Sequence, residues 1–361
     1  MLESVYGNPS LPNRQFNSYL LTCPLMTDTK SKVLGTIVGL AVGDALGAPV
    51  EFIGQAALVA KYGQEGITEL EESYGVPGAY TDDTQMSLAT ADGIIAARDA
   101  ERTPGARAVD PSPFIYVEYI NWFISQSDPK ERRGPGGTCM GALGSGRAGS
   151  VGGKPLNDSK GCGGVMRVAP VGLMYDTPKA WEYGCASAAL THSHPGGYLP
   201  SGFLAVMISY ILEHPVALGS GEASFFDALK KSFDLGMEYL ERAPKCEKRD
   251  HFAALMTQAA GMSQQKKWDD EMAMRKLGAG WCGDEALALT VFIAFRYPKD
   301  FRSAVQKAVL YSGDRDSVGS ITGALMGALL GAEAIPESWL VAVERRDELE
   351  NTALRLFEAR L

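Results

Sequence analysis

The chain has 361 residues, of which 45% are hydrophobic and 21% are charged, a composition typical of a globular protein with enough apolar material for a large core. The formal net charge of −9 and the absence of Lys/Arg-rich runs disfavour a nucleic-acid-binding protein. Scattered cysteines without a C-x-x-C pair and an N-terminus without a signal-like segment predict a cytoplasmic protein with neither a zinc site of the usual spacing nor a membrane partner.

Residues 1–31 differ in composition from the rest of the chain. They combine prolines, asparagines and isolated aromatic residues, and no helical or strand period is evident among them. One interpretation is a disordered leader. The other is an arm that docks on a partner, because aromatic anchors in a flexible segment are typical of such arms. We place a boundary after residue 31 and predict a single domain over residues 32–361.

Glycine recurs every four residues in two apolar segments, residues 33–47 and 318–332. The glycines are Gly35, Gly39, Gly43 and Gly47 in the first segment and Gly319, Gly323, Gly327 and Gly331 in the second. Each costs about 1 kcal/mol in a helix interior relative to alanine, so the pattern predicts two helices that pack very closely against each other. The second segment is shorter than the ~20 apolar residues needed to span a bilayer, which favours a buried helix. Asp44, inside the first helix, needs a hydrogen-bonding partner if it is buried.

Two acidic clusters stand at predicted helix starts. Thr81 is the expected N-cap of a helix that includes residues 86–98, and the second cluster opens the later glycine segment. Helix capping is one explanation for their aspartates, worth about 0.3–1 kcal/mol for each. Two aspartates in each of two matching clusters favour a cation site instead. The clusters are Thr81, Asp82 and Asp83, and Asp314, Asp316 and Ser317.

Glu51 would add a fifth carboxylate to these clusters. Like charges at close range drive protonation, and two divalent cations would nearly neutralise five carboxylates. Oxygen ligands alone favour Mg²⁺, Mn²⁺ or Ca²⁺ over Zn²⁺. A binuclear site can orient a diol or a phosphate and lower the pKa of a bound water. The spacing of these residues leaves the substrate open.

A glycine-rich loop and a histidine pair lie in the middle of the chain. Gly161, Cys162, Gly163 and Gly164 would expose backbone N–H groups that suit a phosphate, with tight packing as the alternative. His192 and His194 lack the further ligands of a metal site, so hydrogen bonding to a ligand or to the backbone is favoured. Almost no β-type alternation occurs, and the rest of the chain predicts an all-α, multi-helix domain. The further predicted helices cover residues 114–125, 138–147, 178–190, 200–213, 222–242, 251–262, 269–278, 284–296, 301–311 and 336–360.

Taken together, these motifs resemble those of the ADP-ribosylglycohydrolases. The resemblance is carried by residues 39–52 (GLAVGDALGAPVEF), 80–85 (YTDDTQ), 163–170 (GGVMRVAP), 191–192 (TH) and 312–317 (SGDRDS). It implies a compact helical fold and a centre of two Mg²⁺ or Mn²⁺ ions. The implied ligands are Thr81, Asp82, Asp83, Asp314, Asp316 and Ser317.

The same resemblance implies roles in cleaving the bond between ADP-ribose and a protein side chain. Glu51 would lie at or beside the metals, and the proton would be handled by Glu51 or by a metal-binding aspartate such as Asp83 or Asp316. The loop 161–164 would bind the pyrophosphate, and His192 would lie along the ribose and adenosine. Gly137 stands where the family often has Asn, which concerns recognition of the leaving group. Arg315 stands where the family commonly has a small hydroxyl residue.

Two functions follow. The first is a hydrolase that removes ADP-ribose from modified proteins, most of all from arginine, and so reverses an ADP-ribosyltransferase. The alternative is a binding-type immunity protein that occludes an ADP-ribosyltransferase toxin through residues 1–31. Both roles could coexist in one immunity protein.

Overall fold

The computed structural model of the protein describes residues 24–103, 108–217 and 219–361. Within these residues sixteen α-helices form one domain, and the only strands are a short antiparallel hairpin of β1 (Glu72–Ser73) and β2 (Val76–Pro77). The predicted all-α class is confirmed. The helices are α1 (Pro24–Gly47), α2 (Gln55–Tyr62), α3 (Asp82–Glu101), α4 (Ser112–Ser125), α5 (Gly137–Gly144), α6 (Ala169–Met174), α7 (Thr177–Ala189), α8 (Pro195–Glu213), α9 (Glu222–Arg242), α10 (Glu247–Ser263), α11 (Asp270–Leu277), α12 (Gly283–Arg296), α13 (Phe301–Tyr311), α14 (Arg315–Leu330), α15 (Glu337–Ala342) and α16 (Arg346–Arg360), with 3-10 turns η1 (Ala48–Val50), η2 (Cys162–Gly164) and η3 (Ala332–Ala334).

The two glycine-patterned helices, α1 and α14, pack against each other as predicted, and they run antiparallel. A Cβ placed on Gly39 would lie 2.5 Å from the carbonyl oxygen of Gly323, and one on Gly43 would lie 2.1 Å from that of Gly319. Such distances leave no room for a side chain, so the backbones are in direct contact along this face. The antiparallel arrangement places the C-terminal end of α1 beside the N-terminal end of α14. Both ends carry acidic residues of the site.

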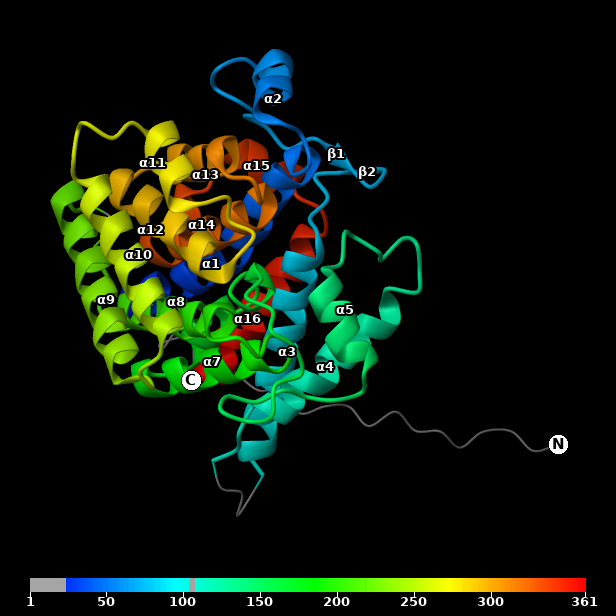
Figure 1. The fold of residues 1–361 in the computed structure, drawn as a ribbon. Helices are drawn as coiled ribbons and strands as arrows, with labels where there is room; N and C mark the ends of the chain where they lie inside the picture. The colour runs from blue at the N-terminus through cyan, green and yellow to red at the C-terminus, as the bar shows by residue number, and fades with distance from the viewer. Residues whose placement is uncertain (1–23, 104–107, 218) are drawn as a thin grey trace.

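The other helices surround this central pair. In Figure 1, α9 and α10 lie on one side of the pair, and α3, α4 and α5 lie on the other. Two helical segments, residues 28–50 and 195–213, are long and apolar enough to cross a membrane by composition. Inside the structure 83% of each apolar window is buried, as expected for the core helices of a large domain.

The first helix begins earlier than predicted. We expected the helix over residues 33–47, but α1 starts at Pro24, so residues 24–32 are helical too. Proline is tolerated in the first turn of a helix because its missing N–H would have no intrahelical acceptor there. The proline at 24 therefore begins the helix and does not interrupt it. Residues 1–23 lie outside the described residues, and the predicted arm stays a prediction.

Three other differences have local causes. α8 starts at Pro195 and not at residue 200, since His194 caps its first turn by accepting a hydrogen bond from the Gly196 N–H. The predicted helix 336–360 is divided into α15 and α16 at Arg345, whose φ of 50° is left-handed. The short helices α2 and α6 were not predicted, because each spans only about two turns.

Candidate metal centre and ligand cavity

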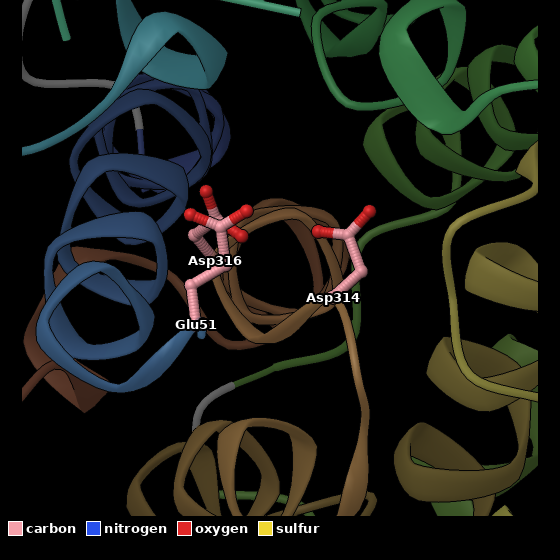
Figure 2. Close-up of side chains that lie close together, drawn as sticks. All are labelled: Glu51, Asp314 and Asp316. Atoms are coloured by element: carbon pink, nitrogen blue, oxygen red, sulfur yellow. The ribbon is translucent and has the colours of Figure 1, made fainter. Parts of the chain in front are cut away.

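The contact between α1 and α14 brings three carboxylates together. Glu51 follows η1 at the end of α1, while Asp314 and Asp316 stand at the start of α14. Each offers one oxygen, and the three oxygens lie within 4.8 Å of one another. Figure 2 shows their side chains gathered over the first turn of α14. The spacing fits a shared hard cation, for which carboxylate oxygens are the preferred ligands.

The start of α3 supplies the second acidic cluster, as predicted. Thr81 is the N-cap, and its Oγ1 accepts a hydrogen bond of 3.3 Å from the Asp83 N–H. The buried Asp44 of α1 holds this helix start in place. Its carboxylate accepts from the Thr81 N–H at 3.0 Å, from the Thr84 N–H at 3.0 Å and from the Thr84 hydroxyl at 2.6 Å. Asp44 therefore has the partners that its burial requires, and it is a positioning residue.

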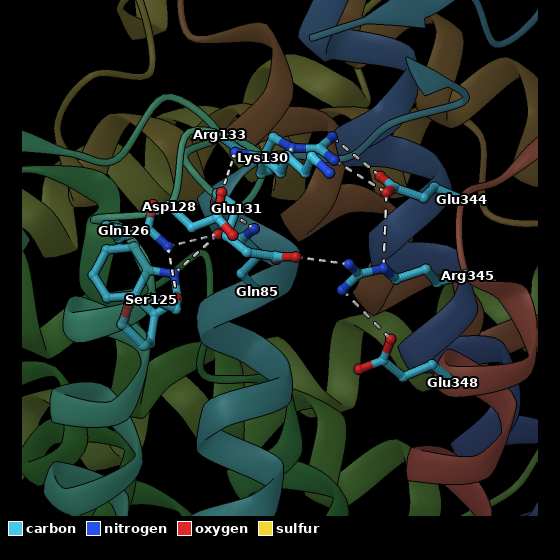
Figure 3. Close-up of polar contacts among 11 residues, drawn as sticks. Gln85, Ser125, Gln126, Asp128, Lys130, Glu131, Arg133, Glu344, Arg345 and Glu348 are labelled. Carbon is cyan, nitrogen blue, oxygen red and sulfur yellow. Dashed lines mark hydrogen bonds and ion pairs between the residues drawn. The ribbon is translucent and has the colours of Figure 1, made fainter. Parts of the chain in front are cut away.

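A loop before α5 holds Asp82 from the other side. The Asp82 N–H donates to the Arg133 carbonyl at 3.0 Å, and the Asp82 Oδ2 accepts from the Gly136 N–H at 3.1 Å. Figure 3 shows how this loop is fixed: the Arg133 guanidinium bonds both carboxylate oxygens of Glu344, at 3.1 and 3.2 Å. Arg345, the residue that separates α15 from α16, reaches Glu131 of the same loop at 2.8 Å. The left-handed Arg345 thus helps to position a wall of the site.

The acidic cluster carries more negative charge than its own protein surroundings neutralise. Burial, and after it the charges of Asp316 and Asp314, raises the pKa of Glu51 to about 9. Burial is also the largest cause that raises the pKa of Asp82, Asp83 and Asp314 well above the usual range. Buried carboxylates with raised pKa values are typical of functional sites. The negative charge of these buried carboxylates must therefore be neutralised by bound protons or by cations.

Two buried oxygens point to a cation specifically. Asp83 Oδ2 and Asp316 Oδ1 are fully buried, and neither has a hydrogen-bonding partner among the described residues. A buried carboxylate oxygen left without a donor costs about 1–3 kcal/mol or more. Hard metal ions bind such oxygens directly. The donor set therefore fits a Mg²⁺-type centre and offers no nitrogen ligand of the kind that zinc prefers.

Arg315 lies between Asp314 and Asp316 at the start of α14, and its guanidinium donates to main-chain carbonyls of the Glu51 segment, including that of Glu51 itself at 3.4 Å. Its buried guanidinium donates to the carbonyls of Val50 at 3.0 Å and Ile53 at 2.7 Å, and to the Gln55 side chain at 3.1 Å. These acceptors flank Glu51 on both sides. Arg315 thus ties the Glu51 segment to the first turn of α14. The departure from a small hydroxyl residue has a structural role here.

A cavity of about 300 Å³ opens directly onto the acidic cluster. The predicted Gly161, Cys162, Gly163, Gly137 and His192 all contribute to its wall. The structure also adds residues to which the sequence analysis assigned no role. Met166 belongs to the 163–170 motif, and the others come from loops or helix faces distant in sequence: Gly134, Gly136, Thr138, Cys139 and Trp281.

One predicted substrate-binding residue, Gly164, and one predicted metal ligand, Thr81, do not line the cavity. Gly164 does not line the cavity: a Cβ on it would meet Ala188 at 2.7 Å and the Gly197 carbonyl at 2.9 Å, so the structure gives it a packing role. Its assignment to the substrate stays a prediction. Thr81 is 1% exposed and is not among the residues that line the cavity, and its hydroxyl oxygen accepts from the Asp83 N–H. Its assignment as a metal ligand stays a prediction. The remaining predicted ligands, including Ser317, face the cavity.

A second cavity of about 650 Å³ adjoins the first through Glu51 and Trp281, which line both. Phe52, 80% exposed, stacks with Trp281 at a centroid distance of 6.4 Å and an interplanar angle of 18°. Tyr311 also contributes to the wall. The acidic cluster therefore lies between a polar, glycine-walled cavity and a wider one with exposed aromatic rings.

The metal-free protein is expected to lose stability as the pH rises from about 5 to about 9. Unfolded carboxyls ionise near pH 4, whereas Glu51 and Asp44 hold their protons in the fold up to pKa values of about 9 and about 7. The folded state therefore binds more protons across this window, and the free energy of unfolding falls as the pH increases. Thermal unfolding of chelator-treated protein at several pH values measures this effect.

Added Mg²⁺ should raise the melting temperature, and more so at about pH 8 than at about pH 5.5, because the ion replaces the protons. NaCl at equal ionic strength serves as the control. A melting temperature that is the same at both pH values in the metal-free protein would contradict the proposed charge balance.

Comparison with known proteins gives a consistent result. A family model described as ADP-ribosylglycohydrolase matches residues 25–361. The chain is 26% identical over 365 residues to the ADP-ribosylhydrolase ARH3 of Bos taurus, covering 90% of this chain and 92% of the relative. It is 24% identical over 338 residues to the ADP-ribosylarginine hydrolase Tri1 of Serratia proteamaculans, covering 92% of this chain and 80% of the relative.

A solved structure described as "ADP-ribosylglycohydrolase-related protein complex" superposes with a TM-score of 0.66 at 23% identity, covering 93% of this chain and all of that one. The fold is therefore shared with that structure.

Proposed function

Because the chain belongs to the ADP-ribosylglycohydrolase family, we propose that it is a metal-dependent hydrolase that removes ADP-ribose from modified protein side chains, with arginine as the modified residue. The observation that carries this proposal is the pair of unpartnered, buried carboxylate oxygens on Asp83 and Asp316 beside an open cavity. In the cytoplasm, such an enzyme would reverse the action of an ADP-ribosyltransferase and could confer immunity to one.

The metal would be two Mg²⁺ or Mn²⁺ ions. When bound, such a pair lowers the pKa of a water and orients neighbouring hydroxyl groups. The charge balance supports two ions, since five carboxylates would otherwise be confined to one buried cluster. The residues that would hold them are Thr81, Asp82, Asp83, Asp314, Asp316 and Ser317.

The protein's own groups would divide the remaining work between the two cavities. The backbone of residues 161–163 forms one wall of the smaller cavity. The Gly161 and Cys162 N–H groups already donate to the Ser159 hydroxyl at 3.3 Å and to the Trp281 carbonyl at 3.1 Å, so the Gly163 N–H is the donor of this loop that would suit the pyrophosphate of ADP-ribose. Glu51 lies at the junction of the two cavities, beside the position where the scissile bond would cross from one to the other. We assign it the proton transfer to or from the leaving group, because Arg315 holds its backbone and no described residue neutralises its carboxylate.

Arginine as the linked residue is supported by two observations. The relative Tri1 is named an ADP-ribosylarginine hydrolase. The wider cavity beyond Glu51 also exposes Phe52 and Trp281, and aromatic faces attract a planar guanidinium by about 0.5–2 kcal/mol. A hydroxyl leaving group such as serine would gain nothing from these rings.

The test is release of ADP-ribose from two matched peptides, one modified on arginine and the other on serine. With Mg²⁺ present we expect the arginine-linked peptide to be cleaved about two- to thirtyfold faster, corresponding to an attraction of about 0.5–2 kcal/mol by the rings. Chelation should stop both reactions, and added Mg²⁺ should restore them. Faster cleavage of the serine-linked peptide would refute the arginine assignment, and turnover that persists in chelator would refute the metal dependence.

A further inference from the structure

A buried line of polar side chains runs from the core to the wall of the smaller cavity. It starts at Arg167, which follows η2, and continues through Thr191 to His192 in the loop between α7 and α8. The Arg167 Nη2 lies 2.7 Å from the Thr191 Oγ1, and that oxygen lies 2.8 Å from the His192 Nδ1. All three side chains are at least 98% buried. Water therefore has almost no access to the hydrogen bonds that join Arg167, Thr191 and the His192 Nδ1.

The direction of the hydrogen bonds follows from the chemistry of the first residue. A guanidinium has only donors, so the Thr191 oxygen must accept from Arg167. The Thr191 hydroxyl hydrogen is then directed to His192 Nδ1, the better acceptor at hand. The nearby Cys139 Sγ is only a weak acceptor, and it already accepts from the Arg167 Nη1 at 3.3 Å. His192 Nδ1 accordingly accepts and carries no proton.

His192 is also held in its neutral form. Burial, and after it the positive charge of Arg167, lowers the pKa of His192 to about 3. A neutral imidazole carries one proton on one of its two nitrogens. With Nδ1 occupied as an acceptor, the proton lies on Nε2.

The Nε2 end faces the cavity and the glycine loop. A Cβ on Gly161 would lie 3.3 Å from this nitrogen, and one on Gly163 would lie 3.1 Å from it, so only glycine allows the ring so close to the loop. His192 lines the cavity, and no described residue accepts a hydrogen bond from its Nε2. The donor is thus free to serve a bound molecule.

Arg167 is anchored without a described carboxylate partner. It stacks over the ring of Tyr119 with its central carbon 4.3 Å from the ring centroid, and it donates to the Ser187 carbonyl at 3.4 Å. A buried cation that is not paired with an anion is costly to maintain. Its retention next to Thr191 is consistent with a role in directing hydrogen bonds and not in forming an ion pair.

We infer that Arg167 and Thr191 are positioning residues that fix His192 as the tautomer protonated on Nε2, so that a neutral N–H donor is presented to an acceptor oxygen of ADP-ribose. The ligand assignment in this inference rests on the proposed function. The tautomer assignment does not, because it depends only on the protein's own groups. A neutral N–H donor can bind an oxygen of ADP-ribose without adding a positive charge beside the acidic cluster, whose negative charge is needed to bind the metal ions.

The tautomer can be read directly by ¹⁵N NMR of the full chain with and without Mg²⁺. The two nitrogens of a neutral imidazole differ strongly in shift according to which carries the proton. The chain has only four histidines, so loss of one signal in H192Q assigns His192. We expect its proton on Nε2 in both samples, unchanged between about pH 6 and about pH 8. A proton on Nδ1 in the wild type would overturn the inference without reference to any substrate.

The role of Thr191 is tested with T191V and T191S. Valine keeps the shape but removes the hydroxyl, and we expect a mixture of both tautomers together with an about tenfold weaker affinity for ADP-ribose by calorimetry. Serine keeps the hydroxyl and should restore both readouts, which a packing role would not predict. T191V that keeps the wild-type tautomer and affinity would also overturn the inference. Failure of the wild type to bind ADP-ribose at all would instead reject the proposed function, while leaving the tautomer result intact.

Discussion

Asp316→Asn is expected to lower kcat/KM for ADP-ribose release by about a thousandfold, the upper end of the range for removing one preorganised electrostatic group. Asp316 interacts electrostatically with the other four carboxylates of the cluster. Its negative charge contributes to the raised pKa of Glu51, Asp82, Asp83 and Asp314. Its Oδ1 is also one of the two buried oxygens without a partner. An amide there retains the shape and loses the charge that binds a cation.

The measurement is steady-state turnover together with metal content of the purified protein. Asp99→Asn is a matched control, since Asp99 is exposed on α3 and, within the part of the chain that the structure describes, pairs only with Arg102; it should leave both readouts unchanged. The same exchange at 316 should stabilise the metal-free fold, because one source of charge repulsion is removed. Wild-type turnover and metal content in Asp316→Asn would exclude this carboxylate from the centre.

Gly43→Ala should destabilise the protein by more than about 4 kcal/mol, although alanine is the better helix former by about 1 kcal/mol. The added methyl group would lie 2.1 Å from the Gly319 carbonyl oxygen and 2.5 Å from its carbon, both of which are backbone atoms that cannot rotate away. The two helices must separate, and with them the residues at their ends. Urea unfolding with and without Mg²⁺ measures the loss.

Gly261→Ala provides the contrast. Gly261 lies in α10, and a Cβ added to it would have no neighbouring atom within 4 Å. Its replacement should therefore stabilise the protein by about 0.5–1 kcal/mol through helix propensity alone. If Gly43→Ala behaved like Gly261→Ala, the close packing of α1 and α14 would not determine the fold.

The sequence was most informative where one residue type had a single physical reason to occur. Glycine at every fourth position of two helices indicates their mutual approach, and the pairing of Gly43 with Gly319 bears this out. Acidic pairs at helix starts indicated which segments would meet. Asp44 was expected to need a partner, and it has three donors in Thr81 and Thr84.

Features that depend on tertiary contacts could not be read in this way. Trp281 joins the two cavities from a loop whose sequence carries no motif. The Arg345 side chain, at the break between α15 and α16, pairs with Glu131, which is 214 residues away in the chain. Gly164 belongs to the glycine-rich loop 161–164, and the packing of Ala188 and of the Gly197 carbonyl against it distinguishes it from the cavity-lining residues of that loop.

The contact between Arg315 and the segment around Glu51 has a consequence for the evolution of related sequences. Its guanidinium bonds to main-chain carbonyls, so the interaction depends on the backbone conformation from Val50 to Ile53 and not on the identity of the side chains there. Relatives with a small residue at this position lack those donors and must secure the equivalent segment by another route. Substitutions at position 315 and changes of length or path near residue 53 are therefore expected to co-vary across the family.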